Sequence, residues 1–183
     1  GRIVPKLAHS EIIAQVFSKT RVGVGVMGAA SLMSAVEPVI RYQRTRFRGA
    51  VGVEESSPRY QQGLQMKEDV TERLADVWAA AEAASSLGFD ISRRYDALEL
   101  IQDEAKAKLG KGRDMLRNMK APMERAVQLL AEGKDPLADD DVTVRYVALL
   151  AVCNILCPSC KLWNTGHGAD VMRQAVTLMG GYG

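Results

Sequence analysis

Apolar residues recur at helical spacing along almost the whole chain, and this periodicity limits the fold more than any other feature of the sequence. Strand-like alternation is nearly absent, and aromatic residues form only 5% of the 183 residues. The apolar fraction of 47% is sufficient to form a globular core, and the charged fraction of 25% is ordinary for a globular protein. The sequence therefore predicts an all-α protein, an antiparallel bundle of about four main helices with a charged helical insertion at about residues 91–141. We expect a single helical domain over residues 1–183.

The first two helices are predicted from their apolar periodicity and from signals at their ends. One long helix begins near Ser10, and Pro38 is expected to kink or break it because proline lacks an N–H donor. The small-residue segment 23–30 in its middle predicts close packing against another backbone. A second helix is expected from about residue 60 to residue 87, with Gly88 as its C-terminal cap.

The second half of the chain is also predicted to be helical. Within the charged insertion, residues 91–109 and 113–130 predict two solvated helices separated by a Gly-Lys-Gly turn. Residues 142–157 form the most apolar segment, which predicts a central helix. Residues 164–168 break the pattern, and a last helix is expected at residues 169–179.

The charge balance and the cysteines bear on partners and on location. Lysine and arginine total 24 against 22 acidic residues, a net charge of +2, so no global field indicates nucleic acid or an anionic membrane. The longest apolar stretch, 147–157, is well short of the roughly 20 residues that span a bilayer, which predicts a soluble chain without a membrane span. No leader-like segment argues for export, and three clustered cysteines fit reduced thiols. We therefore expect a cytoplasmic protein.

Two of the cysteines have the spacing of a zinc knuckle or of a redox pair. Cys157 and Cys160 are separated by two residues, and His167 is the nearby histidine. A second ligand pair is missing, so buried structural thiols are the preferred interpretation and no metal ligand is predicted. A metal-binding bundle that uses these three residues stays open as a weaker alternative.

Two further segments indicate contact with a ligand. Arg41, Arg44, Arg46 and Arg48 lie close together, and guanidinium groups form bidentate bonds with phosphate oxygens. Their confinement to one helix end favours a single nucleotide-like ligand over nucleic acid, and a solvated helix end that complements the macrodipole is the alternative. The closing Gly-Gly-Tyr-Gly segment, 180–183, offers either a helix C-cap or bare backbone against which a cofactor can lie.

Taken together, these segments resemble the C-terminal helical domain of the acyl-CoA dehydrogenases, a family of flavoenzymes. The match rests on the order and spacing of five segments, none of which suffices alone. They are Phe17-Ser18-Lys19-Thr20-Arg21, the small-residue segment 23–30, Tyr42 followed by Arg46, Leu74-Ala75-Asp76, and Ala175-Val176-Thr177-Leu178-Met179-Gly180-Gly181-Tyr182-Gly183. The resemblance covers most of residues 15–78 and 147–183.

The resemblance implies FAD as cofactor and an acyl-CoA thioester as substrate. In this chemistry a carboxylate deprotonates the α-carbon while the β-hydrogen leaves as hydride to the flavin, which gives the α,β-unsaturated acyl-CoA. The family also implies a homo-oligomer, either a dimer or a tetramer, and electron transfer flavoprotein as redox partner. The expected class is therefore an FAD-dependent oxidoreductase of acyl-CoA or fatty acid metabolism.

The family correspondence implies six cofactor-binding residues. They are Arg44, Arg46, Phe47, Thr177, Gly180 and Gly181. Arg46 matches the arginine that contacts the FAD pyrophosphate, usually across a subunit interface. Arg44 is the alternative counterpart, because the Arg-Phe-Arg-Gly segment that starts at Arg46 is one residue shorter than the family pattern. Gly180 and Gly181 match backbone that lies against the adenosine side of the cofactor, and Thr177 stands where the family often has glutamine.

Arg21 and Thr20 are the expected substrate-side residues. Arg21 matches an arginine beside the active site, and Thr20 stands where a minority of the family carries the catalytic carboxylate. Threonine cannot serve as that base, so we expect the base beyond residue 183 and predict no catalytic residue in this chain. The N-terminal helical and β domains of the family are expected outside the chain as well, so the chain alone should be inactive.

A non-catalytic helical interaction or oligomerisation module is the rival hypothesis. In this interpretation the arginines are solvated, the glycines are only helix caps, and no cofactor binds. Within the family interpretation, the charged stretch 91–141 is longer than the usual connection, and its two extra helices have no assigned role; a partner surface or a subfamily surface is the open interpretation.

Overall fold

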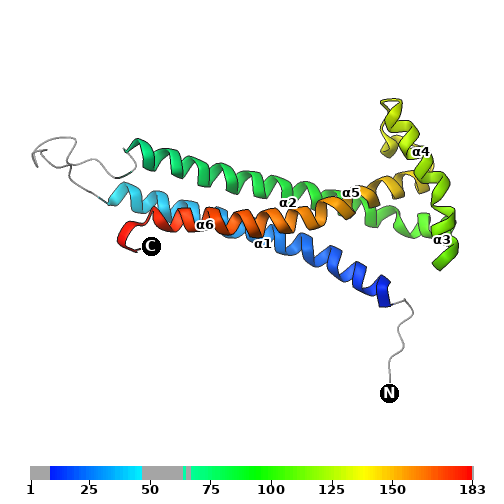
Figure 1. Ribbon diagram of the computed structural model, residues 1–183, viewed down its shortest axis with the longest axis horizontal. Helices are drawn as coiled ribbons and strands as arrows, with labels where there is room; N and C mark the ends of the chain where they lie inside the picture. Colours follow the sequence, from blue (N-terminus) through cyan, green and yellow to red (C-terminus); the bar gives the residue numbers. More distant parts are fainter. Residues whose placement is uncertain (1–8, 47–63, 65–66, 183) are drawn as a thin grey trace, which may run out of the picture. The chain divides into compact units, whose positions relative to one another are not determined.

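Helices account for every regular element that the structure describes (Figure 1). The structure is a computed structural model, and it describes residues 9–46, 64 and 67–182. No strand occurs in these ranges, so the predicted all-α class is confirmed.

The chain divides into two compact units. The first unit comprises Gly1–Gly88 together with Cys160–Gly183, and the second comprises Phe89–Ser159. The predicted charged insertion, residues 91–141, lies within the second unit. The single domain stays a prediction, and each unit is described separately below.

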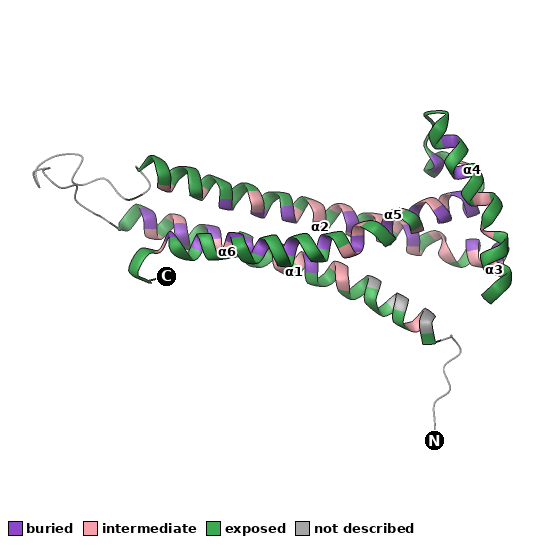
Figure 2. Cartoon of the chain, in the orientation of Figure 1, coloured by how far each residue is buried: buried purple, intermediate pink, exposed green. Residues whose placement is uncertain are grey.

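The first unit is built mainly from α1 (His9–Thr45), the first part of α2 (Glu68–Leu109) and α6 (Gly168–Thr177). α2 runs antiparallel to the other two helices, and their buried faces meet along the middle of the unit (Figure 1, Figure 2). The core consists of small and branched apolar side chains at helical spacing: Ala29, Leu32, Val36, Val39, Val77, Ala81, Ala84, Val171, Ala175 and Leu178. Isolated helices are marginally stable in water, so the burial of this shared apolar face supplies most of the stability of the three helices.

Of the kink or break predicted at Pro38, the break is wrong, because α1 continues through this residue, and the kink stays a prediction. The proline removes only the bond that its N–H would give to the carbonyl of Ser34. Pro38 is exposed, so water can take the place of the missing donor. Val36 and Val39 are buried on the other side of the helix and hold it against the core.

α2 runs through Gly88, although the sequence predicted a helix end there. Gly88 lies against α1: a Cβ at this position would be 3.1 Å from Cγ2 of Val26. The glycine therefore permits close packing and does not end the helix. The helices predicted over residues 60–87 and 91–109 are one helix, and residues 60–63 and 65–66 of that prediction lie outside the described residues.

The end of α2 falls where the Gly-Lys-Gly turn predicted it. Gly110 has a φ of 85°, a left-handed conformation that suits glycine and stops the helix. The side-chain amide of Asn118 donates to the carbonyl of Leu109 at 2.9 Å and satisfies one of the last free carbonyls of α2.

In the second unit, the single helix predicted over residues 113–130 is divided into α3 (Gly112–Asn118) and α4 (Lys120–Ala131). The division falls at Met119. Pro122 has no N–H to donate to the carbonyl four residues earlier, so the helical ladder is interrupted at this point. The prediction of helices in this region is confirmed, but the prediction of one continuous helix is wrong.

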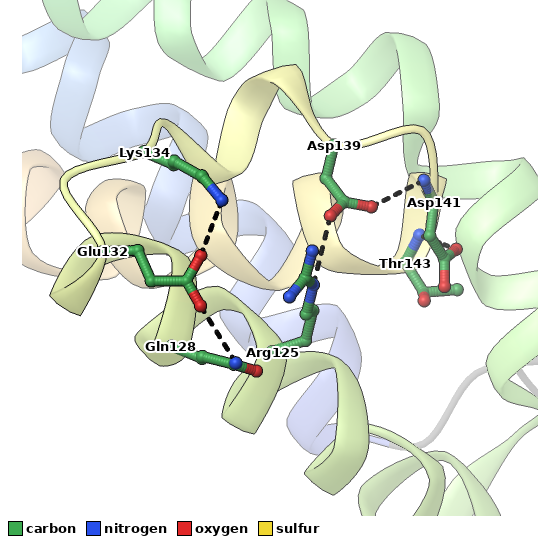
Figure 3. Close-up of polar contacts among 7 residues, drawn as sticks. All are labelled: Arg125, Gln128, Glu132, Lys134, Asp139, Asp141 and Thr143. Atoms are coloured by element: carbon green, nitrogen blue, oxygen red, sulfur yellow. Dashed lines mark hydrogen bonds and ion pairs between the residues drawn. The ribbon is translucent and has the colours of Figure 1, made fainter.

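An acidic turn that contains the short helix η2 (Pro136–Ala138) leads from α4 to α5. Asp141 accepts a hydrogen bond from the backbone N–H of Thr143 at 2.9 Å, and this bond holds the pKa of the Asp141 carboxyl below its ordinary value. The guanidinium of Arg125 on α4 lies 3.5 Å from a carboxylate oxygen of Asp139 (Figure 3). Side-chain contacts thus add to the backbone hydrogen bonds of η2 in holding this turn.

α5 (Val142–Leu162) continues directly into the π-helix η3 (Trp163–His167) and then into α6. The predicted interruption at residues 164–168 is therefore wrong. The polar and glycine residues that predicted it form the wider π-helical turn, a rare element that is often found at functional sites. The last helix ends close to its predicted boundary, at Thr177.

Within the first unit, α1 packs closely against the end of α5 and against η3. We call this contact the glycine seam and define it as Gly25, Gly28, Cys160 and Asn164. A Cβ at Gly25 would lie 2.5 Å from Sγ of Cys160, and a Cβ at Gly28 would lie 3.1 Å from the carbonyl oxygen of Asn164. The close packing predicted for the small-residue segment is confirmed at these two glycines.

Asn164 is the polar centre of the glycine seam and is only 2% exposed. Its side-chain amide donates to the carbonyl of Gly25 at 2.9 Å and to the carbonyl of Ala84 at 3.0 Å. One side chain thereby connects α1, α2 and η3. Gly23 does not share in this packing: a Cβ there would meet no described atom within 4 Å, so the prediction of close packing is wrong at that residue.

Candidate functional site

The C-terminal end of α1 and the segment after α6 lie together at one end of the first unit (Figure 1). We call residues 178–182 the glycine turn. Gln43 donates from its side-chain amide to the carbonyl of Leu178, across 135 residues of sequence. The rings of Tyr42 and Tyr182 meet edge to face with centroids 5.9 Å apart. Two segments that the sequence linked to one cofactor are therefore adjacent in space.

The position of the glycine turn follows from how α6 ends. Leu178 caps the helix, and its carbonyl is one of the four that the helix itself leaves without a donor. Gln43, which is 1% exposed, supplies that donor. Gly180 then takes a φ of 59°, which glycine adopts without strain, and the chain turns.

The two glycines of the predicted cofactor site differ in what surrounds them. A Cβ at Gly180 would lie 3.7 Å from the hydroxyl oxygen of Tyr42. A Cβ at Gly181 would meet no described atom within 4 Å, and this residue is exposed. The packing described here therefore gives a reason for glycine at residue 180, through its φ, and gives none at residue 181.

Thr177 lies beside the glycine turn, and both hydrogen-bonding roles of its hydroxyl are used. The hydroxyl donates to the carbonyl of Gln174 at 2.7 Å. It also accepts a hydrogen bond from Nη2 of Arg73, on the second turn of α2, at 3.3 Å. The family resemblance implies Thr177 as a cofactor contact but does not single out Arg73, whose proximity arises only from tertiary packing.

The predicted arginines are at the same end of the unit, but their contacts are few. Arg44 and Arg46 are both exposed, and the backbone N–H of Arg46 donates to the carbonyl of Tyr42 at 2.7 Å. Phe47, the third cofactor residue predicted in this segment, lies outside the described residues. Both arginines are exposed, so exposure does not decide which of them is the cofactor arginine.

The predicted substrate-side residues lie far along α1 from the glycine turn. Arg21 stacks its guanidinium over the ring of Phe17 at 5.5 Å, and the hydroxyl of Thr20 donates to the carbonyl of Val16 at 2.9 Å. Because α1 is one helix, the 26 residues from Thr20 to Arg46 correspond to roughly 39 Å along its axis at 1.5 Å per residue. The structure does not bring the two predicted sets of residues together.

The three cysteines are buried thiols, as the sequence predicted. Burial raises the pKa of the Cys160 thiol. A hydrogen bond from Cys157 lowers the pKa of Cys153, with help from the charge of Arg94. His167, the third residue of the metal alternative, has its ring against Trp163, with ring centroids 4.7 Å apart. In the described ranges, no group of three or more His, Cys, Asp and Glu side chains could hold a metal ion, so the metal alternative has no support.

Two helical stretches, Lys19–Thr45 and Val142–Thr177, have the length and apolar composition that a membrane crossing requires. Core helices of globular proteins pass the same test, and the first unit buries part of each stretch. This finding is weak evidence for a membrane span, and the predicted absence of such a span stays a prediction.

Comparison of the chain with models of known families, with curated proteins and with solved structures gives no match. The resemblance to the acyl-CoA dehydrogenases therefore rests on the five sequence segments and is carried forward as a proposal.

Proposed function

We propose that this chain is the C-terminal helical part of a flavin-dependent acyl-CoA dehydrogenase, which oxidises an acyl-CoA thioester to its α,β-unsaturated product. One observation carries the proposal. The end of α1 with Arg46 and the glycine turn, which the resemblance assigns to the same FAD, are joined by the Gln43 to Leu178 hydrogen bond and by the Tyr42 to Tyr182 ring contact.

The groups at this end of the unit fit a nucleotide cofactor. The exposed guanidinium groups of Arg44 and Arg46 can donate forked hydrogen bonds to phosphate oxygens. Gly181 presents bare backbone with space above it, which allows a flat ligand to approach closely. Gln43 holds the turn in place from the buried side, so the backbone is ordered before a ligand arrives.

The protein residues in this proposal bind and orient, and the base is supplied from outside residues 1–183. FAD, when bound, would accept the hydride that leaves the β-carbon. Arg46 or Arg44 would hold the phosphates, and the glycine turn would lie along the adenosine. Arg21 and Thr20 would line the substrate side, where neither side chain can take the α-proton at neutral pH.

The distance along α1 supports an oligomer. Thr20 and Arg46 are roughly 39 Å apart along the helix axis, which is further than one dinucleotide reaches. The two ends of α1 in one chain would therefore serve different cofactor molecules, so that each site is completed by a second copy. We accordingly propose a homo-oligomer, a dimer or a tetramer, in the cytoplasm, with electron transfer flavoprotein as the redox partner.

One observation favours the rival function, a helical interaction module without a cofactor. In the second unit, α4 exposes three apolar side chains at helical spacing, Met123, Val127 and Leu130, and α3 exposes Leu116. Side chains of this kind on one helix face are typical of surfaces that another protein covers. A separate measurement is needed to decide between the two functions.

Native mass spectrometry of the purified protein is that measurement, because it reports subunit number and bound cofactor together. The proposal predicts an oligomer that retains FAD, at one molecule per subunit, and that loses it when the protein is denatured. A preparation to which FAD does not bind, even when the cofactor is added in excess, would overturn the proposal and favour the interaction module.

A further inference from the structure

We propose that Arg73 is a further ligand for the phosphate-bearing part of the cofactor at the glycine turn. The inference rests on the function proposed above and adds a residue from α2 to a site otherwise made by α1 and the glycine turn. It starts from the hydrogen bonds of Thr177, the residue that the sequence analysis placed at this position.

Thr177 cannot itself donate to a phosphate oxygen in this arrangement. A hydroxyl has one proton, and Thr177 gives it to the carbonyl of Gln174 at 2.7 Å. The lone pairs of the same oxygen face a donor, Nη2 of Arg73, at 3.3 Å. An anion beside Thr177 would therefore be bound by the guanidinium of Arg73, which donates a hydrogen bond to the Thr177 hydroxyl.

Arg73 has N–H donors and a positive charge that are available to such an anion. A guanidinium carries five N–H donors, and the bond to Thr177 uses one of them. No carboxylate among the described residues forms an ion pair with Arg73, which is exposed. A fixed fork with unused N–H groups matches the oxygens of a phosphate, and such charge-assisted bonds are stronger than neutral ones.

The location selects the class of ligand. Thr177 is three residues before Gly180, and the space above Gly181 is open, so a group bound along the glycine turn passes close to Arg73. Together with Arg44 and Arg46 at the end of α1, Arg73 would give the site cations on two helices. This arrangement suits a nucleoside diphosphate moiety, which carries two phosphates.

The test measures binding of FAD and of ADP to the purified protein by isothermal titration calorimetry. Arg73→Gln is expected to weaken the affinity for both ligands by about tenfold or more, because a hydrogen bond to a charged group is lost. Arg73→Lys keeps the charge without the fork and should fall between the wild type and Arg73→Gln. Arg93→Gln, an exposed arginine on the same helix in the second unit, is the matched control and should bind as the wild type does.

A double-mutant cycle separates a ligand contact from a merely structural one. Thr177→Val should weaken ADP binding about threefold while Arg73 is present, and should have no effect in the Arg73→Gln background. Thr177→Ser should restore the wild-type affinity, because it restores the acceptor. ADP affinity should also fall less steeply with added salt in Arg73→Gln than in the wild type.

Two outcomes overturn the inference, and they can be told apart. In the first outcome, the wild type binds FAD and ADP, and Arg73→Gln binds both with dissociation constants within twofold of the wild-type values. Arg73 then only connects α2 to α6, and the proposed function stands. If the wild type binds neither ligand, the proposed function fails and the inference fails with it.

Discussion

In the glycine seam a side chain at Gly25 would collide with Sγ of Cys160, whereas in the glycine turn a side chain at Gly181 would meet no described atom within 4 Å. The seam is tightly packed: Cys160 is fully buried, and the amide of Asn164 donates to carbonyls of two other helices. In the glycine turn, Gln43 donates to the carbonyl of Leu178 on the buried side, and residues 180–182 are exposed. The same residue type thus serves internal packing in one region and an open surface in the other.

This difference separates glycines that the fold explains from glycines that it does not. Glycine in an ordered element is unfavourable by about 0.5–1 kcal/mol relative to alanine. At Gly25 and Gly28 the close approach of the last helical stretch offsets that penalty. At Gly23 and Gly181 the described chain supplies no such compensation, and contact with a ligand or a second subunit is one explanation that can be tested. Stability and binding measurements on matched variants can test this division.

The largest effect is expected from Asn164→Asp. The new carboxylate would face the carbonyl oxygens of Gly25 and Ala84, to which the amide now donates. An unpaired buried charge of this kind destabilises by about 3–5 kcal/mol at neutral pH. Because burial raises the pKa of the new carboxyl above about 3.9, the native state binds more protons than the unfolded state, and the loss should shrink as the pH falls. Urea denaturation at several pH values measures it.

Asn154→Asp provides the control for that variant. Asn154 is exposed on α5, so the same substitution there should change the free energy of unfolding by no more than about 0.5 kcal/mol. Equal losses for the two variants, or an Asn164→Asp loss that does not depend on pH, would contradict the description of the glycine seam as a closed polar contact.

The free energy of unfolding is expected to fall in Gly25→Ala and to rise in Gly23→Ala. The added methyl at Gly25 would lie 2.5 Å from Sγ of Cys160, and such overpacking destabilises by about 1–3 kcal/mol. The methyl at Gly23 meets open space in a helix, where alanine is more stable than glycine by up to about 1 kcal/mol. Thermal unfolding of both variants measures the difference.

A second substitution sharpens that comparison. Cys160→Ala removes the sulfur that obstructs the methyl, so Gly25→Ala should be less destabilising in that background than in the wild type. Additive losses in the double variant would show that the clash lies elsewhere, and destabilisation by Gly23→Ala would show that this glycine also serves packing.

The sequence predicted where helices occur better than it predicted which residues end them. Gly110 and Gly88 are both glycines after an apolar helical pattern, yet only Gly110 adopts a positive φ and ends the helix. Gly88 continues the helix because Val26 of α1 packs against it, and no local signal reports a neighbour 62 residues away. Tertiary packing, which is absent from local periodicity, decides between a capping glycine and a packing glycine.

The same limit applies to the candidate site. The glycine turn and the arginines at the end of α1 could be named from the chain, because their residue types carry the chemistry. Gln43 and Arg73 could not be named, because an amide and an arginine at ordinary helical positions become informative only beside Leu178 and Thr177. For Asn164, the available signal was a polar residue within an apolar helical stretch, which was interpreted as a break.

The smallest effect on stability, and the most direct test of the open surface, is expected from Gly181→Ala. Since its Cβ would meet no described atom within 4 Å and its φ is not positive, the free energy of unfolding should change by less than about 0.5 kcal/mol. If a cofactor lies along this backbone, the added methyl should still weaken FAD binding by roughly tenfold, or about 1.4 kcal/mol. Gly180→Ala, with its φ of 59°, should instead destabilise the fold by about 1 kcal/mol. Full FAD affinity in Gly181→Ala would mean that the ligand does not approach the glycine turn, and that a second subunit is the better reason for its open glycine.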